Sequence, residues 1–229
     1  MSVTIVIPTV TAEIDSMEID VPRGTTIIAA AKFCGINIPT LCHLEGLSPY
    51  GSCRICSVEV STDGGETFKV AASCTYELHR DNIIVRTDTP KLRRIRRMLA
   101  ELLVTSAPNV KLAQDIAARM GINTVRFEME DNRCILCGRC IRMCAEQMGD
   151  GALGFAGRGT ERVVSPPFAT KAEICLTCGG CDQVCPAKLI PCQGFKVPGE
   201  LCGKCLRPED MPFCCSLGTF GCSCERNPL

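Results

Sequence analysis

Two cysteine runs with identical spacing dominate the second half of the sequence. The stretches "CILCGRCIRMC" (134–144) and "CLTCGGCDQVC" (175–185) both follow the pattern C-x2-C-x2-C-x3-C. Three cysteines at this spacing can wrap three corners of a cubane [4Fe–4S] cluster. The fourth cysteine begins the next helix and points away, so it ligates the other cluster. The repeat therefore predicts two cubane clusters, each held by three cysteines of one run and one of the other.

This exchange assigns a ligand set to each predicted cubane. The first cluster is expected to be held by Cys134, Cys137, Cys140 and Cys185. The second is expected to be held by Cys144, Cys175, Cys178 and Cys181. Pro186 follows the second run, whereas Ala145 follows the first, a departure that removes no ligand. Two zinc sites are the alternative, although zinc sites favour paired C-x2-C motifs over an exchanged triplet.

The total cysteine content raises the question of disulfides. The chain has 229 residues, of which 20 are cysteine, a share that signals a framework of disulfides or metal sites. The beginning "MSVTIVIPTV" lacks the features of a signal peptide, and no apolar run is long enough to cross a bilayer. We therefore expect a reducing cytoplasm, where clustered cysteines bind metal, and disulfide pairing is the alternative.

Composition and motifs exclude several classes of function. The formal net charge is zero, so no overall field attracts nucleic acid or an anionic membrane. There is no Trp and aromatic residues make up 4%, which leaves little for base stacking. The sequence has no G-x-G-x-x-G on a strand–helix turn, no Walker A loop and no nucleophile–base pair. We expect no nucleic-acid partner and no catalytic site of its own.

The first 88 residues are predicted to form a small mixed α/β unit. A helix is expected within "GTTIIAAAKFCG" (24–35), with Thr25 as its N-cap and Gly35 as its end. Asp63-Gly64-Gly65 predicts a hairpin turn. Residues between the first two strands are expected to form a polar turn. The strands are expected at 3–8, 17–21, 56–60, 67–74 and 82–87.

Four cysteines in this unit are spaced for a different cluster. Their pattern, C-x10-C-x2-C-x17-C, suits a [2Fe–2S] rhomb, which needs four thiolates, but it is not the C-x4-C-x2-C of plant-type ferredoxins. His43 and His79 are expected outside the ligand set, because a Rieske-type centre needs two histidine ligands. Cys34 is expected to be a small buried hydrophobe of the first helix. The predicted ligands are Cys42, Cys53, Cys56 and Cys74.

A helical linker is predicted after Pro90. The apolar face of "KLRRIRRMLAELLVTSA" is expected to hold Leu92, Ile95, Leu99, Leu102 and Leu103. Arg93, Arg94, Arg96 and Arg97 are expected largely off that face. They form either a solvated basic face or a docking surface for an acidic partner subunit. A second short helix is expected at 109–121.

The tail at 192–229 is rich in Gly, Pro and Cys and is too irregular to pack a core alone. A bound metal, either a third [4Fe–4S] cluster or zinc, would give such a segment a structure. The alternative is a flexible, thiol-rich tail. The candidate ligands are Cys192, Cys202, Cys205, Cys214, Cys215, Cys222 and Cys224.

Three stretches together resemble a known group of redox subunits. They are "PTLCHLEGLSPYGSCRICSVEV", "RRIRRMLAELL" and "NRCILCGRCIRMCAE". They resemble the N-terminal region of the large peripheral subunit of respiratory complex I. They are equally similar to the iron–sulfur and diaphorase subunits of NAD-linked and electron-bifurcating hydrogenases or transhydrogenases. The resemblance covers about residues 1–190. It implies a β-grasp fold for the first domain and electron transfer between a flavin/NAD(H) subunit and another redox site.

One departure from that group is informative. Its members usually carry, between the two iron–sulfur domains, a cluster ligated by one histidine and three cysteines. Residues 80–133 contain neither His nor Cys, so this cluster is expected to be absent. The resemblance then implies a shortened relay, better suited to a hydrogenase-like or transhydrogenase-like complex than to complex I itself.

The sequence thus predicts an α+β chain in four parts. These are a β-grasp [2Fe–2S] domain at 1–88, a helical linker at 89–130, a bacterial-type domain with two [4Fe–4S] clusters at 131–191 and a Cys-rich metal-binding tail at 192–229.

The expected function is electron relay within a soluble flavin/NAD(P)-linked oxidoreductase complex. The expected partners are a flavin/NAD(P)-binding subunit, further iron–sulfur subunits and a ferredoxin, and electron bifurcation would be a property of a flavin site elsewhere. One alternative is the iron–sulfur subunit of a succinate/fumarate oxidoreductase, although its first loop has shorter C-x4-C spacing. A zinc-stabilised interaction module is an alternative from another class.

Overall fold

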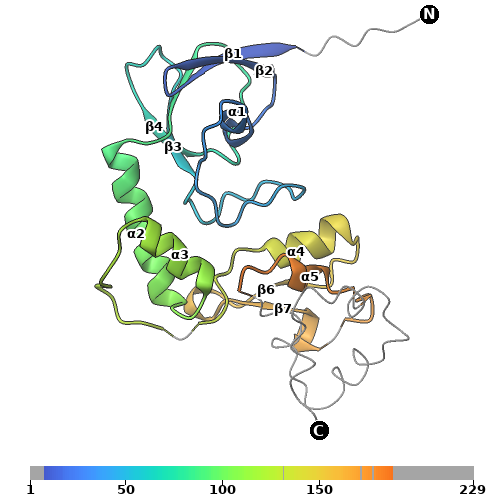
Figure 1. Cartoon of the computed structure of the whole chain (residues 1–229). Coiled ribbons are helices and arrows are strands. Elements are labelled where there is room, and N and C mark those ends of the chain that lie inside the picture. Colours follow the sequence, from blue (N-terminus) through green and yellow to red (C-terminus); the bar gives the residue numbers. More distant parts are fainter. Residues whose placement is uncertain (1–7, 131, 171, 177, 188–229) are drawn as a thin grey trace, which may run out of the picture. The chain divides into compact units, whose positions relative to one another are not determined.

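The computed structural model describes residues 8–130, 132–170, 172–176 and 178–187 (Figure 1). The chain divides into two compact units, with Cys137 the last residue of the first and Gly138 the first residue of the second. The candidate tail ligands between Cys192 and Cys224 lie outside the described residues.

A five-stranded mixed sheet forms the centre of the first unit. Its order is β2-β1-β5-β3-β4, in which β1 and β5 run parallel and all other neighbours run antiparallel. Because β5 lies between β1 and β3, the strand that is last in the sequence joins the two hairpins. The strands are β1 (Thr9–Ile14), β2 (Met17–Pro22), β3 (Ser57–Ser61), β4 (Lys69–Ala72) and β5 (Ile83–Arg86).

The first hairpin differs from the prediction. Residues expected to form a polar turn are strand β1, in which Val10, Ala12 and Ile14 alternate inward and are buried. The turn is only Asp15-Ser16, with φ values of 47° and 69°. The strand expected at 3–8 lies almost entirely outside the described residues. The prediction for residues 9–14 was wrong because the threonines and Glu13 masked a period of two.

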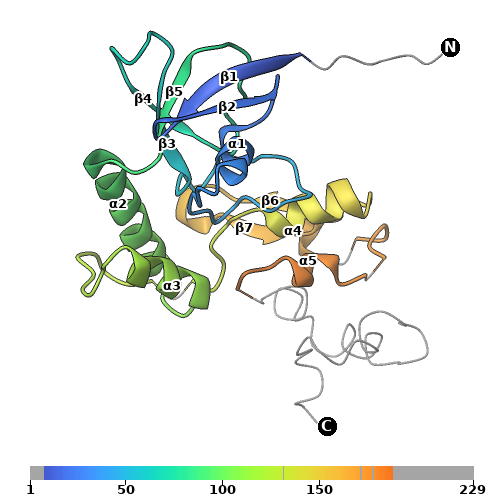
Figure 2. The ribbon, with the colours of Figure 1, turned by 45° about the horizontal axis from the view of Figure 1, so that its top comes forward.

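Helix α1 (Ile27–Phe33) lies against the sheet (Figures 1 and 2). Ile27, Ala30 and Ala31 are fully buried in one core with the strands. The N-cap is Thr26 and not Thr25, because Thr26 is extended and its hydroxyl accepts from Ala29 N at 3.4 Å. Thr25 instead donates to the Pro22 carbonyl at 2.6 Å. Gly35, at φ +74°, follows the end of the helix as predicted.

The predicted hairpin turn at Asp63-Gly64-Gly65 is confirmed. It joins the antiparallel strands β3 and β4, and both glycines have positive φ, 74° and 97°. The Asp63 carboxylate accepts from Thr67 N at 3.0 Å and holds the loop closed.

Two helices complete the first unit. Helix α2 (Pro90–Ser106) begins at a proline, and the hydroxyl of its N-cap Thr89 accepts from Leu92 N at 3.2 Å. Helix α3 (Lys111–Arg119) packs against it. The predicted face of α2 is partly wrong. Arg96 is buried, whereas Leu102 is 46% exposed. The buried stripe that includes Leu92 and Ala100 passes through Arg96 because these residues are four apart.

The second unit contains short elements only. Helix α4 (Arg139–Arg142) continues into the wider helical turn η1 (Met143–Gln147), where Met148 N donates to Met143 O at 3.1 Å. Helices α4 and α5 lie side by side in both views (Figures 1 and 2). No helix among the described residues is long and apolar enough to span a membrane. The other elements are β6 (Gly154–Ala156), η2 (Gly159–Glu161), β7 (Val163–Ser165), η3 (Pro167–Ala169) and α5 (Gly180–Gln183), with β6 and β7 paired antiparallel.

Candidate metal centres

The four cysteines predicted to bind the [2Fe–2S] cluster lie on loops at one end of the sheet. Cys53 and Cys56 directly precede β3, and Cys74 follows β4. Cys42, Cys56 and Cys74 are fully buried, and Cys53 is half-buried. Segments 32 residues apart in the sequence are therefore brought together by the pairing of β3 with β4 and by the long loop after α1.

The thiols of these cysteines form two pairs. The sulfur atoms of Cys56 and Cys74 are 3.4 Å apart. Cys42 N donates to the Cys53 sulfur at 3.5 Å, and a hydrogen bond with the Cys42 thiol raises the pKa of Cys53. In a [2Fe–2S] rhomb each iron takes two protein thiolates, so two buried pairs fit this cofactor.

In the Cys56–Cys74 pair, one thiol is more easily deprotonated than the other. The hydrogen bond between the two thiols lowers the pKa of Cys56 to about 6 and raises the pKa of Cys74. Cys56 is therefore inclined to be a thiolate at neutral pH, the form that binds iron. Burial opposes ionisation of Cys53 and Cys74, and a bound cation would remove this penalty.

At Gly51 the loop between Cys42 and Cys53 closely approaches Thr75, the residue that follows Cys74. This glycine has φ +67°, and a Cβ there would lie 2.9 Å from Thr75 Cγ2. The Gly51 amide also interacts with the Cys74 thiol. A side chain at position 51 would adopt a strained backbone conformation and displace the Thr75 side chain, so glycine is favoured there.

A second apolar core covers this loop from the side of the helices. Buried Leu41, Cys42 and Ile55 pack with Ala100 of α2 and Ile116 of α3. Around this core lie the half-buried side chains of Tyr50, Cys53, Leu99, Leu103, Leu112, Met120, Ile122, Ile135 and Cys137. The segment expected as a linker therefore shields the cysteine loop from water. Exclusion of water is one of the factors that set the reduction potential of such a cluster.

The sequence repeat of the second unit is also a repeat of backbone conformation. Gly138 and Gly179 occupy the same place in the two runs and have φ values of 67° and 72°. Each is the N-cap of a short helix, and the second residue of that helix is a cysteine, Cys140 or Cys181. The left-handed glycine turns the chain, so that the cysteines on both sides of it can face one point.

The four cysteines expected at the second cubane interact within the second unit. Burial, together with the charges of the nearby Cys178, Cys144 and Cys175, raises the pKa of Cys181 to about 12. Cys144 comes from the first run and the other cysteines from the second. Ala152 N donates to the Cys144 sulfur at 3.2 Å. Cys144 therefore lies close enough to the second run to interact electrostatically with Cys181.

The cysteines expected at the first cubane are divided between the units. Cys134 and Cys137 belong to the first unit, where Leu136 N donates to the Cys134 sulfur at 3.4 Å. Cys140 and Cys185 belong to the second unit, and both are buried. This ligand set stays a prediction.

The remaining candidates are placed as follows. His79 is an exposed residue paired with Glu77 at 2.9 Å, and His43 is half-buried. Cys34, expected to be buried, is only half-buried, because it caps the C-terminal end of α1. Among the described residues, no three His, Cys, Asp or Glu side chains gather as ligands of a single metal ion would.

Two residues near the site were not found from the sequence. Arg96 is buried against β3, and Glu101 is a buried residue of α2 whose carboxylate accepts from Arg126 Nη2 at 2.7 Å. This pairing with Arg126 lowers the pKa of Glu101 to about 2. Leu92, Arg96 and Ala100 are spaced four residues apart, which indicates one helix face. The prediction placed Arg96 off the buried face because its side chain is charged.

Comparison with known proteins identifies both cysteine regions. Residues 8–90 match the family described as a 2Fe-2S iron-sulfur cluster binding domain. Residues 133–189 match the family described as a 4Fe-4S dicluster domain. The expectation of one [2Fe–2S] and two [4Fe–4S] clusters is confirmed at the level of these domains.

Similar proteins are larger redox subunits. NADPH-Fe(3+) oxidoreductase subunit alpha of Geobacter sulfurreducens is 30% identical over 94% of this chain and 27% of its own length. NADP-reducing hydrogenase subunit HndD of Solidesulfovibrio fructosivorans is 34% identical over 77% of this chain and 35% of its own. The NADH-ubiquinone oxidoreductase 75 kDa subunit of Reclinomonas americana is 32% identical over 76% of this chain and 28% of its own. The chain thus spans about a quarter to a third of the length of these curated relatives.

A solved structure is similar over most of the chain. A chain of the NAD+-reducing [NiFe]-hydrogenase in the H2-reduced state has a TM-score of 0.60 and 28% identity. The likeness covers 69% of this chain and 75% of that chain. The α+β fold class and the resemblance drawn from the sequence are confirmed. The chain is an iron–sulfur protein related to subunits of NAD(P)-linked hydrogenases and oxidoreductases, with a [2Fe–2S] domain followed by a [4Fe–4S] dicluster domain.

Proposed function

We propose that this chain relays single electrons within a multisubunit, flavin/NAD(P)-linked oxidoreductase. The observation that carries the proposal is that one chain joins a [2Fe–2S] domain to a dicluster domain. The relatives named above are subunits of NAD(P)-linked enzymes, which supports the same setting for this chain. Such clusters accept and release one electron at a time.

The proposed ligands of the [2Fe–2S] cluster are the paired thiols of the first unit. Their burial and their pairing two by two support this assignment. The low pKa of Cys56 supports it as well, because iron binds thiolates. The set is Cys42, Cys53, Cys56 and Cys74.

The proposed ligands of the two cubanes follow the exchange pattern. The interaction of Cys144 with Cys181 supports a second site that takes one ligand from the first run. The equal conformations of Gly138 and Gly179 support equal cluster-binding turns. The second set is Cys144, Cys175, Cys178 and Cys181, and the first is Cys134, Cys137, Cys140 and Cys185. A further metal site in the tail at 192–229 stays a prediction.

The protein's own residues would hold and tune these centres. The amides of Ala152 and Leu136 donate to the Cys144 and Cys134 sulfurs, which stabilises negative charge at the thiolates. The second apolar core keeps water from the [2Fe–2S] loop on the side of the helices. Both effects would contribute to the reduction potentials of the clusters.

The partners we propose are a flavin/NAD(P)-binding subunit and further iron–sulfur subunits in the cytoplasm. A hydride delivers two electrons to flavin, and a one-electron carrier is then needed to take them singly. Residues 80–133 lack His and Cys, so we propose that the relay has no histidine-ligated cluster between its domains. This suits a transhydrogenase-like or electron-bifurcating hydrogenase-like complex.

Metal analysis of the anaerobically purified full chain tests the proposal. One [2Fe–2S] and two [4Fe–4S] clusters require about ten irons with matching acid-labile sulfide, and a third cubane would raise this to about fourteen. Reduced FMN should bleach the visible absorption of the clusters in a stopped-flow experiment, whereas NADH alone should not. A colourless zinc protein, or fewer than about six irons, would contradict the relay.

A further inference from the structure

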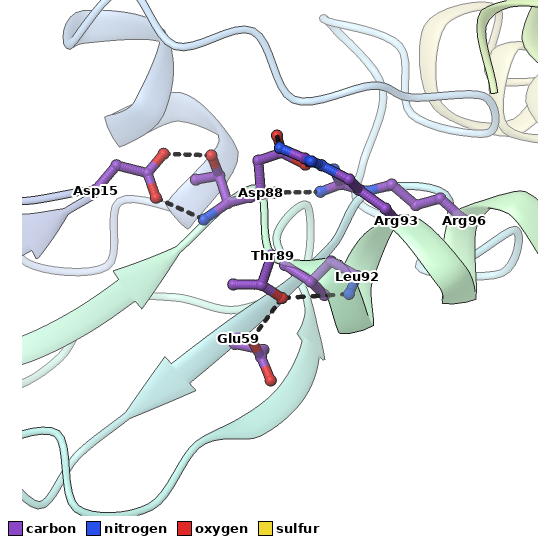
Figure 3. A network of polar contacts seen from close by, with 8 residues as sticks. Asp15, Glu59, Asp88, Thr89, Leu92, Arg93 and Arg96 are labelled. Atoms are coloured by element: carbon purple, nitrogen blue, oxygen red, sulfur yellow. Dashed lines mark hydrogen bonds and ion pairs between the residues drawn. The ribbon is translucent and has the colours of Figure 1, made fainter. Parts of the chain in front are cut away.

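Arg96 is a buried cation at the junction of α2 and the sheet. It is 5% exposed, and its Nη2 donates to the carbonyl oxygens of Ser57 and Thr87, both at 2.7 Å. Figure 3 shows Arg96 extending from α2 toward the end of β5. Its Nε is also buried and has no hydrogen-bond partner among the described residues. Burial of a full charge is costly unless opposite charge lies near it.

Ser57 directly follows Cys56. Arg96 therefore forms a hydrogen bond with the backbone next to a proposed ligand of the [2Fe–2S] cluster. Burial lowers the pKa of Arg96, whereas Asp88, Cys56 and Asp15 act in the opposite direction. A guanidinium keeps its proton at neutral pH even when buried. Arg96 is thus a permanent positive charge that interacts electrostatically with the sulfur of Cys56.

The other acidic groups near Arg96 have partners of their own. Asp88 is paired with Arg93 at 2.5 Å, as Figure 3 shows. Asp15 accepts a hydrogen bond from Thr87 N at 2.8 Å. Glu59 is paired with Lys91 at 3.1 Å. Asp88, Cys56 and Asp15 are thus the anionic groups that act on Arg96, and both carboxylates already bind other residues.

We propose that Arg96 raises the reduction potential of the [2Fe–2S] cluster by stabilising the charge that the cluster gains when reduced. This inference rests on the proposed assignment of Cys56 as a ligand. In the step concerned, a one-electron donor such as a reduced flavin loses one electron and one iron(III) becomes iron(II). No covalent bond forms or breaks, and the centre becomes more negative by one charge. A nearby buried cation favours that change because water screens it little.

The electrostatic role of Arg96 can be tested separately from its structural role as a hydrogen-bond donor. The two carbonyl oxygens need only hydrogen-bond donors, which a neutral amide also offers. An Arg96→Gln variant therefore removes the charge and keeps a donor, whereas Arg96→Lys keeps the charge. Arg94→Gln is a matched control, because Arg94 is an exposed arginine of the same helix.

The test is a redox titration of the full chain, followed by EPR, with thermal unfolding measured in parallel. Arg96→Gln should make reduction of the [2Fe–2S] signal about tenfold less favourable, which is ~59 mV for a one-electron couple. The cubane potentials should not change. Arg96→Lys and Arg94→Gln should behave like the wild type.

Asp15→Asn gives an independent test should Arg96→Gln lose its cluster. Removing the competing carboxylate leaves Arg96 less balanced, so the potential should rise, opposite to the effect of Arg96→Gln. An unchanged potential in Arg96→Gln that holds its cluster, or an unchanged potential in Asp15→Asn, would overturn the inference. A wild-type chain without a [2Fe–2S] signal would instead refute the proposed function.

Discussion

The two units position their cysteines by different means. In the first unit a sheet, three helices and two apolar cores surround the cysteine loop. In the second unit the elements are only three to five residues long. Its buried thiols, those of Cys140, Cys144 and Cys185, outnumber its buried apolar side chains, which among the described residues are Ala152 and Pro166.

This difference indicates where the folding free energy comes from. Burial of apolar side chains stabilises the first unit, each large one by about 1.5–3 kcal/mol. Too few such side chains are buried in the described part of the second unit to offset the loss of chain entropy. Metal binding that occurs only in the folded state contributes to folding directly. We therefore expect the first unit to fold by packing and the second to fold around its clusters.

Removal of iron should give the largest difference in stability between the two units. After chelation under denaturing conditions and refolding without iron, hydrogen exchange should be slow in β1, β3 and β5 and fast throughout α4 and α5. The second unit should lose all of its protection from hydrogen exchange, because no metal ions would then join its cysteines. Equal protection of both units in the iron-free chain would contradict the comparison.

Loss of one exchanged ligand should have the next largest effect. A Cys185→Ser variant should lose the EPR signal of the cluster assigned to Cys134, Cys137 and Cys140, and about four irons with it. Cys34→Ser, which replaces a half-buried cysteine outside every proposed set, is the control and should keep its full iron content. Damage confined to the cluster of the second run would show that no exchange occurs.

A cavity in the first unit should cost stability without removing its iron. Leu92→Ala removes a fully buried side chain of α2 and should destabilise the first unit by about 3 kcal/mol. Leu102→Ala truncates the same residue type on the same helix where it is 46% exposed, and should cost less than about 0.5 kcal/mol. Denaturant unfolding followed by far-UV circular dichroism measures both. Equal effects would mean that α2 packs through a different face.

The smallest effect should come from the repeated glycine turns. Gly138→Ala and Gly179→Ala each place a Cβ at a left-handed residue, which costs about 1–2 kcal/mol. Because the two turns have the same conformation, the two variants should release iron to a chelator at similarly increased rates. Ala156→Gly, which changes an exposed residue of β6 outside the turns, should release iron more slowly than either. A large difference between the two glycine variants would show that the turns are not equivalent.

The sequence predicted most of the elements of the first unit and both kinds of cluster. Strands β2 to β5 and helices α1 to α3 lie where their patterns indicate, within a few residues. The errors lie at positions where two local interpretations compete. Thr25 and Thr26 are both good caps, and only the backbone conformation of Thr26 decides between them. For β1, polar side chains on the exposed face hid the inward alternation.

The two cubane sites could be predicted from the sequence because three of the four proposed ligands of each are close together in the chain. Gly138 and Gly179 provide the turn within each of these triplets. The face that α2 buries is a different matter. A helix with apolar residues on several sides can pack through more than one stripe, and the sheet selects the stripe that contains Arg96. Only the tertiary structure places that charge against Ser57, the neighbour of Cys56. The contact joins residues 39 positions apart, so their approach depends on packing and not on spacing.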